Sequence, residues 1–256
     1  MLTRLMPKFS VITVTYNARQ CVEETIMSVI TQTYHNIEYI VIDGASTDGT
    51  MDIVRRYADR IDHIVSEPDE GLYYAMNKGM ALATGDYLCF LNAGDSLHED
   101  DTLAGMVHGL HGLKELPDIL YGETALVDRH GHFISMRRHK APAHLTWRSF
   151  RHGMMVCHQA FFAARRIAEP YDTRYRFSSD FDWCIRMMRK AHGIHDTRMT
   201  LIDYCNEGMT TRNHRASLIE RYRIMCRHYG AVDATMMHVW FAIRLALRLE
   251  RRGDGQ

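Results

Sequence analysis

Residues 39–50 read YIVIDGASTDGT. The first four are β-branched or aromatic, which is typical of a buried strand. The strand ends on Asp43, and the turn that follows favours the start of a helix. A second run, at residues 87–95, reads YLCFLNAGD and ends on Asp95. Two strands with acidic ends place carboxylates at one edge of one sheet, where open α/β sheets bind ligands such as sugars, bases or phosphate-bound cations.

Strand and helix patterns alternate through the first hundred residues, which predicts a parallel sheet with helices on both faces. The expected strands are residues 9–15, 37–42, 63–66 and 87–91. After Asp95 the alternation loosens. Further strands are expected at 119–127, 133–136, 158–162 and 200–204, a helix at 180–191, and mostly helix from 213. The middle of the chain therefore looks like a mixed half that completes a cleft.

The composition suits a globular enzyme with a full core, because 46% of the 256 residues are hydrophobic. The net charge is zero, but residues 1–130 carry 9 basic and 20 acidic side chains. The basic second half suits phosphate or an anionic membrane surface, although the two halves could equally pair with each other. Six scattered cysteines without a Cys-x-x-Cys pair indicate reduced thiols in the cytoplasm. We expect no signal peptide, no transmembrane helix and no nucleic-acid partner.

Four segments, in this order and spacing, carry a resemblance to a known family. They are Thr15–Asn17, Asp43–Thr50, Ser66–Gly79 and Leu91–Asp95. Together they resemble family 2 glycosyltransferases of the GT-A fold, notably bacterial exopolysaccharide and O-antigen transferases of the colanic-acid type. The resemblance implies an α/β GT-A domain over residues 1–215. Residues 8–100 would form its Rossmann-like nucleotide-sugar-binding half and 101–215 its acceptor half, sharing a mixed central sheet, with a helical C-terminal extension at 216–256.

The resemblance implies a donor site for a UDP- or GDP-linked sugar. Its expected residues are Thr15, Tyr16, Asn17, Asp43, Ser46, Asn77, Lys78, Asn92 and Asp95. Asp43 could accept a hydrogen bond from the edge of a base, and the ammonium group of Lys78 could form an ionic contact with phosphate. Each also has a structural alternative: Asn17 could cap a helix, Ser46 could form a turn, and Lys78 could lie in solvent.

Asp95 is the expected ligand of a Mg²⁺ or Mn²⁺ ion, which would stabilise the charge of the departing diphosphate. Such ions usually take one or two protein carboxylates, with phosphate and water completing the shell. The family commonly has further acidic residues just before this aspartate. Here those positions are Asn92 and Gly94, so Asp95 stands nearly alone.

The resemblance places the catalytic base at Asp180, in the segment Phe177–Trp183. A carboxylate at the start of a helix is favoured in its ionised form, which a base requires. His158 and Gln159 match an acceptor-side His-Gln pair, and Asp182 is a weaker acceptor-binding candidate. Simple alternatives are a helix cap at Asp180 and a core histidine at His158.

Two further segments of the basic half have possible roles. Residues 207–215 could form a lid over the diphosphate. Residues 236–252 read as a basic amphipathic helix that could dip into a bilayer interface or pack against protein. Membrane contact would suit a lipid-linked acceptor and a peripheral position on the inner face of the cell membrane.

The resulting hypothesis is an inverting, metal-assisted glycosyltransferase that moves one sugar to a hydroxyl of a lipid-linked oligosaccharide in surface polysaccharide biosynthesis. A polyprenyl-phosphate glycosyltransferase is the first alternative, and a non-catalytic sugar-nucleotide-binding protein is the second. A sugar-nucleotide pyrophosphorylase would need a glycine-rich, lysine-containing loop after the first strand, which residues 15–19 do not supply. The sequence leaves the base, the sugar, the linkage and the oligomeric state open.

Overall fold

The computed structural model describes residues 6–205 and 214–253, with side chains described for residues 6–205 and 215–244. The strands are β1 (Phe9–Thr15), β2 (Ile37–Asp43), β3 (His63–Ser66), β4 (Tyr87–Asn92), β5 (Ser96–Leu97), β6 (Ile119–Val127), β7 (Phe133–Met136), β8 (Phe161–Ala164) and β9 (Ile194–Cys205). The α-helices are α1 (Val22–Ile30), α2 (Thr50–Arg56), α3 (Leu72–Leu82), α4 (Thr102–Gly109), α5 (Ser179–Lys190), α6 (His214–Tyr229) and α7 (Ala231–Gly253). Short 3₁₀ helices are η1 (Ala58–Arg60), η2 (Trp147–His152), η3 (His158–Ala160) and η4 (Arg165–Ile167).

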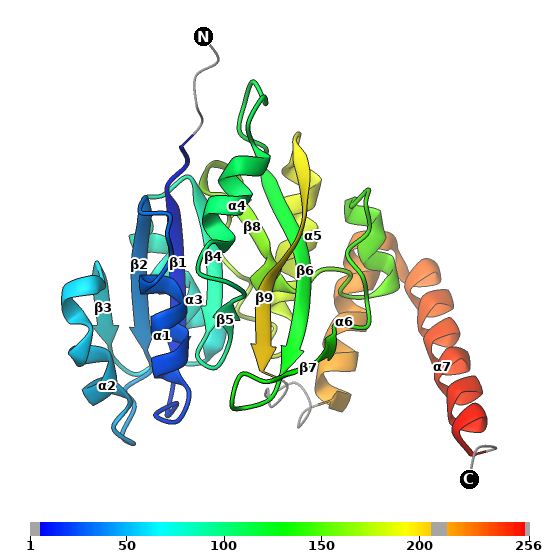
Figure 1. Ribbon diagram of the computed structural model, residues 1–256. Helices are drawn as coiled ribbons and strands as arrows, with labels where there is room; N and C mark the ends of the chain where they lie inside the picture. The colour runs from blue at the N-terminus through cyan, green and yellow to red at the C-terminus, as the bar shows by residue number, and fades with distance from the viewer. Residues whose placement is uncertain (1–5, 206–213, 254–256) are drawn as a thin grey trace.

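One mixed sheet organises the described residues, with the strand order β3-β2-β1-β4-β8-β6-β9-β5 and β7 paired to β6. The first four strands in this order are parallel, and β8 joins β4 and β6 in antiparallel fashion. Figure 1 shows α1 and α4 in front of the sheet and α3 behind it. This α/β arrangement confirms the predicted fold class.

Strand β1 lies at the centre of the parallel half, and all seven of its residues are buried. Its neighbours are in register at their carboxyl ends, because Thr15 is opposite Asp43 and Val14 is opposite Asn92. The acidic turns after β2 and β4 therefore lie at one edge of the sheet, as their positions in the sequence predict.

Helix α3 packs closely on the parallel strands because Gly79 has no side chain. A Cβ atom at this position would collide with Cγ2 of Ile12. The helix begins after Gly71, whose φ of 148° lies in a region that favours glycine. The Gly79 contact fixes the height of α3 over the sheet, and thereby the position of Tyr73 in its first turn.

Glu38 on β2 joins three segments of the sheet edge opposite the acidic turns. Its carboxylate accepts hydrogen bonds from the hydroxyl of Ser10 at 2.5 Å and from that of Thr84 at 2.6 Å, and it pairs with Lys8 at 3.2 Å. Burial would raise the pKa of Glu38, but the hydrogen bonds outweigh it and lower the pKa to about 2. Glu38 is therefore ionised in the folded protein at neutral pH.

Helices α6 and α7 contact each other, and they pack against α5 and η2 respectively. Ala234 and Met237 of α7 are buried, whereas Val232, Met236, Val239, Trp240 and Ile243 are exposed. None of the helices, as far as the chain is described, is long and apolar enough to cross a membrane. The predicted lid, residues 207–215, lies outside the described residues except for α6 at its end, and so do the side chains of 245–252.

Candidate active site

A cleft of about 1910 Å³ opens at the carboxyl edge of the parallel strands. Part of its lining comes from the ends of β1 and β4 and from the start of α3, and other parts come from η3, α5, α6 and α7. Among the predicted site residues, the cleft is lined by Thr15, Tyr16, Asn92, Asp95, His158, Gln159 and Asp180. Residues more than 160 positions apart in the chain therefore share one cavity.

Asp95 lies just after β4 with only 4% of its surface exposed. Its Oδ2 accepts a hydrogen bond from the amide of Gln159 at 2.7 Å, and its Oδ1 accepts one from the backbone N–H of Cys205 at 3.1 Å. Burial raises the pKa of Asp95 to about 7, although both hydrogen bonds act in the opposite direction. A cation bound to this carboxylate would offset the free-energy cost of keeping its negative charge away from water.

Asp180 lies in the first turn of α5 and lines the same cleft as Asp95. The hydroxyl of Tyr73 donates to its Oδ1 at 3.0 Å, and Nδ1 of His158 lies 3.5 Å from its Oδ2. Its side chain stays 19% exposed. The N-cap residue of α5 is Ser178, so Asp180 lies inside the first turn and is not the cap.

The adjacent residues His158 and Gln159 connect the two carboxylates. Gln159 holds Asp95, and His158 contacts Asp180. Burial lowers the pKa of His158, although nearby Asp180 opposes this shift. The pair lies in the 3₁₀ helix η3 rather than in the predicted strand, because the strand β8 begins only at Phe161.

The turn after β1 divides into an exposed part and a structural part. Tyr16 is 67% exposed and lines the cleft, so its ring can receive a flat base. Asn17 has a φ of 49°, and its side-chain oxygen accepts a hydrogen bond from the N–H of Thr47. Helix α1 begins only at Val22, so the expectation that Asn17 caps it was wrong.

Asp43 is enclosed and Ser46 is half-buried, and neither lines the cleft. The carboxylate of Asp43 is completely buried. It accepts hydrogen bonds from the hydroxyl of Ser46 at 2.5 Å and from that of Ser66 at 2.6 Å. Asp43 therefore lies beneath the turn that follows β2, and its hydrogen bonds fix the shape of this turn.

Asn77 and Lys78 also contact protein rather than the cleft. The side chain of Asn77 donates to the carbonyl oxygen of Tyr171 and accepts from its N–H, at 3.0 and 2.7 Å. Lys78 lies 2.6 Å from carboxylate oxygens of both Glu67 and Asp69. Both residues anchor α3 to neighbouring segments.

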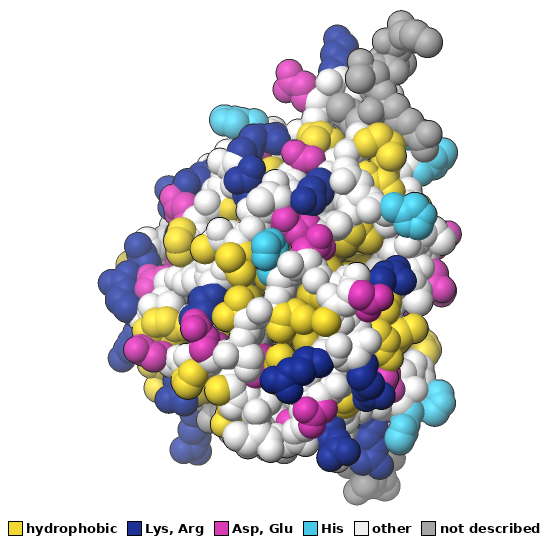
Figure 2. Space-filling view, turned by 90° about the vertical axis from the view of Figure 1, so that its left-hand side faces the viewer, with side chains coloured by type: hydrophobic (Ala, Val, Ile, Leu, Met, Phe, Trp, Pro, Cys, Tyr) yellow, Lys and Arg dark blue, Asp and Glu magenta, His cyan; other side chains and the backbone are white. Residues whose placement is uncertain are grey.

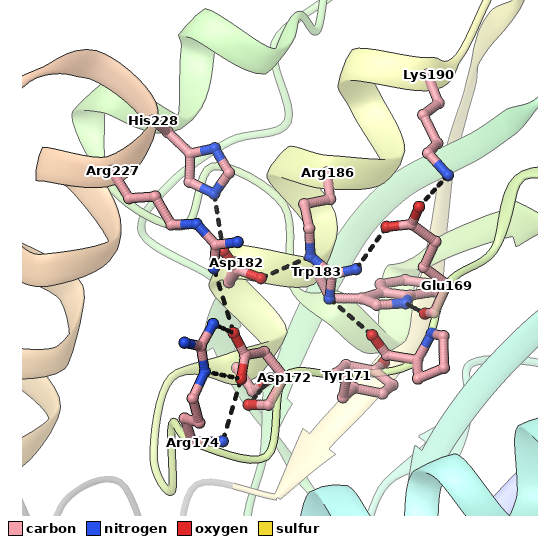
Figure 3. Close-up of polar contacts among 12 residues, drawn as sticks. Glu169, Tyr171, Asp172, Arg174, Asp182, Trp183, Arg186, Lys190, Arg227 and His228 are labelled. Atoms are coloured by element: carbon pink, nitrogen blue, oxygen red, sulfur yellow. Dashed lines mark hydrogen bonds and ion pairs between the residues drawn. The ribbon is translucent and has the colours of Figure 1, made fainter.

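Asp182 belongs to a network of ion pairs that joins α5 to α6, as Figure 3 shows. Its fully buried carboxylate lies 2.6 Å from Arg186 and 2.7 Å from His228. Burial alone would raise the pKa of Asp182, but the hydrogen bonds from His228 and Arg186 lower it. Asp182 does not line the cleft, so the structure gives no support to the expected acceptor contact.

Tyr73 and four arginines that line the cleft were not predicted from the sequence; the arginines are Arg137, Arg138, Arg221 and Arg244. Tyr73 carries only the signal of an apolar helix face, which says nothing of its hydroxyl. The arginines come from separate elements. Only the basic charge of residues 131–256 indicated them.

A mixed sheet with a parallel half, and two carboxylates, Asp95 and Asp180, that line one cleft, are the arrangement typical of the GT-A fold. The chain belongs to glycosyl transferase family 2, whose model matches residues 10–170. It is a glycosyltransferase.

Curated relatives agree with this assignment. The chain is 37% identical over 186 residues to a PGL/p-HBAD biosynthesis glycosyltransferase of Mycobacterium bovis BCG, covering 70% of this chain and 69% of the relative. It is 39% identical over 102 residues to the putative teichuronic acid biosynthesis glycosyltransferase TuaG of Bacillus subtilis, covering 39% and 40%.

Solved structures share the fold. Residues 1–349 of S. aureus TarS in complex with UDP superpose with a TM-score of 0.66 at 18% identity, covering 88% of this chain and 68% of that one. The mannosyltransferase PcManGT of Pyrobaculum calidifontis, in complex with GDP-Man and Mn²⁺, gives a TM-score of 0.63 at 19% identity, covering 98% and 76%.

Proposed function

We propose that this enzyme transfers one sugar, with inversion, from a UDP- or GDP-linked donor to a hydroxyl of a lipid-linked saccharide. The observation that carries the proposal is that Asp95 and Asp180 line one cleft and are connected through Gln159 and His158. The relatives named for PGL/p-HBAD and teichuronic acid biosynthesis favour a surface glycan as the product. The structural neighbours in complex with UDP or GDP-Man favour a nucleotide-sugar donor.

The donor's nucleotide is proposed to lie on the β1 side of the cleft. Tyr16 would stack on the base, and Thr15 and Asn92 each have a buried side-chain oxygen without a hydrogen-bond partner in the described structure. A bound donor supplies the partners that such oxygens require. Asp43, Ser46 and Asn17 act indirectly here, because their mutual contacts hold the loop that carries the site.

The residues present fit a Mg²⁺ or Mn²⁺ ion that binds together with the donor. No three His, Cys, Asp or Glu side chains in the described residues converge on a metal position. Asp95, however, is a buried carboxylate on the cleft wall, and Asn92 adds an unpartnered oxygen. A site with one carboxylate relies on the donor's phosphate oxygens for its remaining ligands. When bound, the ion supplies positive charge to the departing diphosphate.

Asp180 is proposed to take the proton from the attacking acceptor hydroxyl. As that oxygen bonds to the anomeric carbon, the bond from this carbon to the diphosphate breaks, and the diphosphate leaves with the electron pair. The hydrogen bond from Tyr73 to Oδ1 orients Asp180, and Nδ1 of His158 lies 3.5 Å from Oδ2 of the same carboxylate. A positioned base contributes about 10²–10⁴-fold to the rate.

We also propose that the enzyme acts in the cytoplasm, at the inner face of the cell membrane. The exposed face of α7 carries Trp240 and Ile243, which are 53% and 46% exposed, next to Arg244. An apolar helix face flanked by arginine suits an anionic bilayer surface.

The deciding experiment measures sugar transfer by purified protein with a panel of UDP- and GDP-sugars, Mn²⁺ and a membrane lipid extract. Asp180→Asn should lower the turnover number by about 10²–10⁴-fold with unchanged donor affinity. Asp101→Asn, at an exposed carboxylate before α4, is the matched control and should resemble the wild type.

Other outcomes separate the alternatives. Wild-type turnover by Asp180→Asn would contradict the assigned base, and transfer to polyprenyl phosphate in that variant would identify a polyprenyl-phosphate glycosyltransferase. Nucleotide binding without turnover on any donor would indicate a non-catalytic protein.

A further inference from the structure

The start of helix α5 is held in place by side chains of α6. Arg176 and Phe177 line the cleft and lead directly into α5, whose first turn carries Asp180. The side chain of the N-cap residue, Ser178, makes no cap hydrogen bond to α5 in the described structure. Its hydroxyl instead lies 3.0 Å from the hydroxyl of Ser217 on α6. The first turn of α5 therefore depends on contacts from outside the helix.

The carboxylate of Glu220, one turn beyond Ser217 on α6, holds the two residues that precede Ser178. Its Oε1 accepts a hydrogen bond from the backbone N–H of Arg176 at 2.9 Å, and its Oε2 accepts one from the N–H of Phe177 at 2.8 Å. Hydrogen bonds to an ionised carboxylate are about twice as strong as those between neutral groups. One side chain therefore fixes two successive peptide units of the cleft wall.

Glu220 lies behind this wall and close to the pair formed by Tyr73 and Asp180. It is half-buried, and it is not among the residues that line the cleft. Burial and the charge of Asp180 raise the pKa of Tyr73, and the charge of Glu220 raises it further. Glu220 therefore supports the wall of the site rather than forming it.

Helix α6 contacts the same region again near its other end, as Figure 3 shows. His228 lies 2.7 Å from Asp182 of α5. Arg227 lies 3.2 Å from Asp172, which precedes α5. These contacts are about two turns from Glu220 along α6. Loss of Glu220 would therefore leave α5 and α6 together but would free the peptide units in front of α5.

Exposed carboxylates on the open surface have a different environment. On the face that Figure 2 shows, acidic and basic side chains are interspersed. Exposed ion pairs contribute little to stability. Glu220 differs from them because both of its oxygens accept hydrogen bonds from the main chain. Its contacts fix the path of the chain rather than balance surface charge.

We infer that Glu220 is a positioning residue for Asp180, because it fixes the two peptide units that lead into the turn carrying this carboxylate. The inference rests on the proposed function, in which Asp180 takes the proton of the acceptor hydroxyl. Tyr73 orients the carboxylate itself, and Glu220 orients the main chain that carries it. The precision matters because a displacement of about 1 Å at a reacting group can lower a rate by about 10²-fold.

Glu220→Gln tests the inference with little change in side-chain volume. Its NH₂ group would face a backbone N–H, so only one of the two hydrogen bonds can persist. We expect kcat to fall by about 10- to 100-fold, with nucleotide affinity and KM for the donor within about twofold of the wild type. Glu169→Gln is the matched control, because Glu169 pairs with Arg186 and Lys190 in the second half of α5. Its kcat should stay near the wild-type value.

A double-mutant cycle with Asp180→Asn separates positioning from a general loss of active protein. If Glu220 acts through Asp180, adding Glu220→Gln to Asp180→Asn should lower the residual single-turnover rate by less than about twofold. An equal loss of rate in the wild-type and Asp180→Asn backgrounds would overturn the inference.

Amide hydrogen exchange, followed by NMR, gives a readout that does not depend on catalysis. The N–H groups of Arg176 and Phe177 should exchange about tenfold faster or more in Glu220→Gln than in the wild type. Unchanged exchange at both groups, or faster exchange with an unchanged kcat, would overturn the positioning role. Wild-type turnover by Asp180→Asn would instead contradict the proposed base, whatever the exchange rates are, so the two failures are distinguishable.

Discussion

The side-chain amide of Gln159 donates a hydrogen bond to the buried carboxylate of Asp95, with 2.7 Å between Nε2 and Oδ2. The thiol of Cys157 holds the other end of the amide, at 2.7 Å from Oε1. This relationship connects the acceptor half to the only acidic residue in the segment Asn92–Asp95. It fixes the carboxylate that we propose to hold the donor's cation.

We expect Gln159→Ala to lower kcat/KM by about 10- to 100-fold, because a hydrogen bond to a charged group contributes about 1.5–3 kcal/mol. The free energy of unfolding should fall as well, because Gln159 is buried and its loss leaves a carboxylate oxygen of Asp95 without its partner. Steady-state kinetics with the preferred donor provide the measurement. An unchanged kcat/KM would mean that the position of Asp95 does not depend on Gln159.

Tyr73→Phe should lower kcat by about tenfold, because it removes the hydroxyl that orients Asp180. Donor affinity should be unchanged, since the ring and its packing remain. Tyr74→Phe is a suitable control, because Tyr74 is the next residue, is 36% exposed and does not line the cleft. Equal kcat values for the two variants would argue against an orienting role for Tyr73.

Asp182→Asn should reduce the free energy of unfolding by about 3 kcal/mol, because it leaves Arg186 and His228 without their buried charged partner. Donor affinity should stay near the wild-type value. Chemical denaturation and nucleotide titration measure the two effects. A variant with wild-type stability and a raised KM for the acceptor would instead restore the predicted binding role.

Glu38→Gln should destabilise the protein by about 2 kcal/mol at neutral pH. The pKa of Glu38 is lowered to about 2 from its usual 4.5, so its ionised form stabilises the fold above pH 4.5. This contribution is lost as the pH falls from 4.5 towards 2. Urea unfolding at pH 7, 5, 4 and 3 should show the difference from the wild type shrinking.

Glu115→Gln, at an exposed position, is the control and should show little difference at any pH. A Glu38→Gln effect that is constant between pH 7 and 3 would mean that the charge of Glu38 is not what stabilises the sheet.

Trp240→Glu/Ile243→Glu should abolish co-sedimentation with vesicles that contain phosphatidylglycerol. Both side chains are exposed, whereas Met237 on the same helix is buried, so these changes spare the packing of α7 better than a truncation would. Met27→Glu on α1, at a position 39% exposed, controls for the added negative charge. Unchanged vesicle binding by the double variant would reject lipid contact through this helix.

The sequence by itself determined the parallel half of the fold. The expected strands 9–15, 37–42, 63–66 and 87–91 agree with β1 to β4 within one residue. These segments are local runs of apolar residues between turn residues, and such a pattern is typical of a buried strand. Helix α4 and strand β5 were not predicted, because they are only eight and two residues long and their positions depend on contacts with β9 and α1.

The sequence also determined which side chains could meet at the carboxyl edge, because parallel strands align their ends. Only the tertiary structure decided which of them face the cleft. Asp43 is enclosed because Ser66 arrives from β3, whereas Asp95 and Asp180 line the cleft because η3 lies between them. The arginines of the cleft lining, Arg137, Arg138, Arg221 and Arg244, come together only when three distant segments pack against one another, and no local pattern in the chain encodes that proximity.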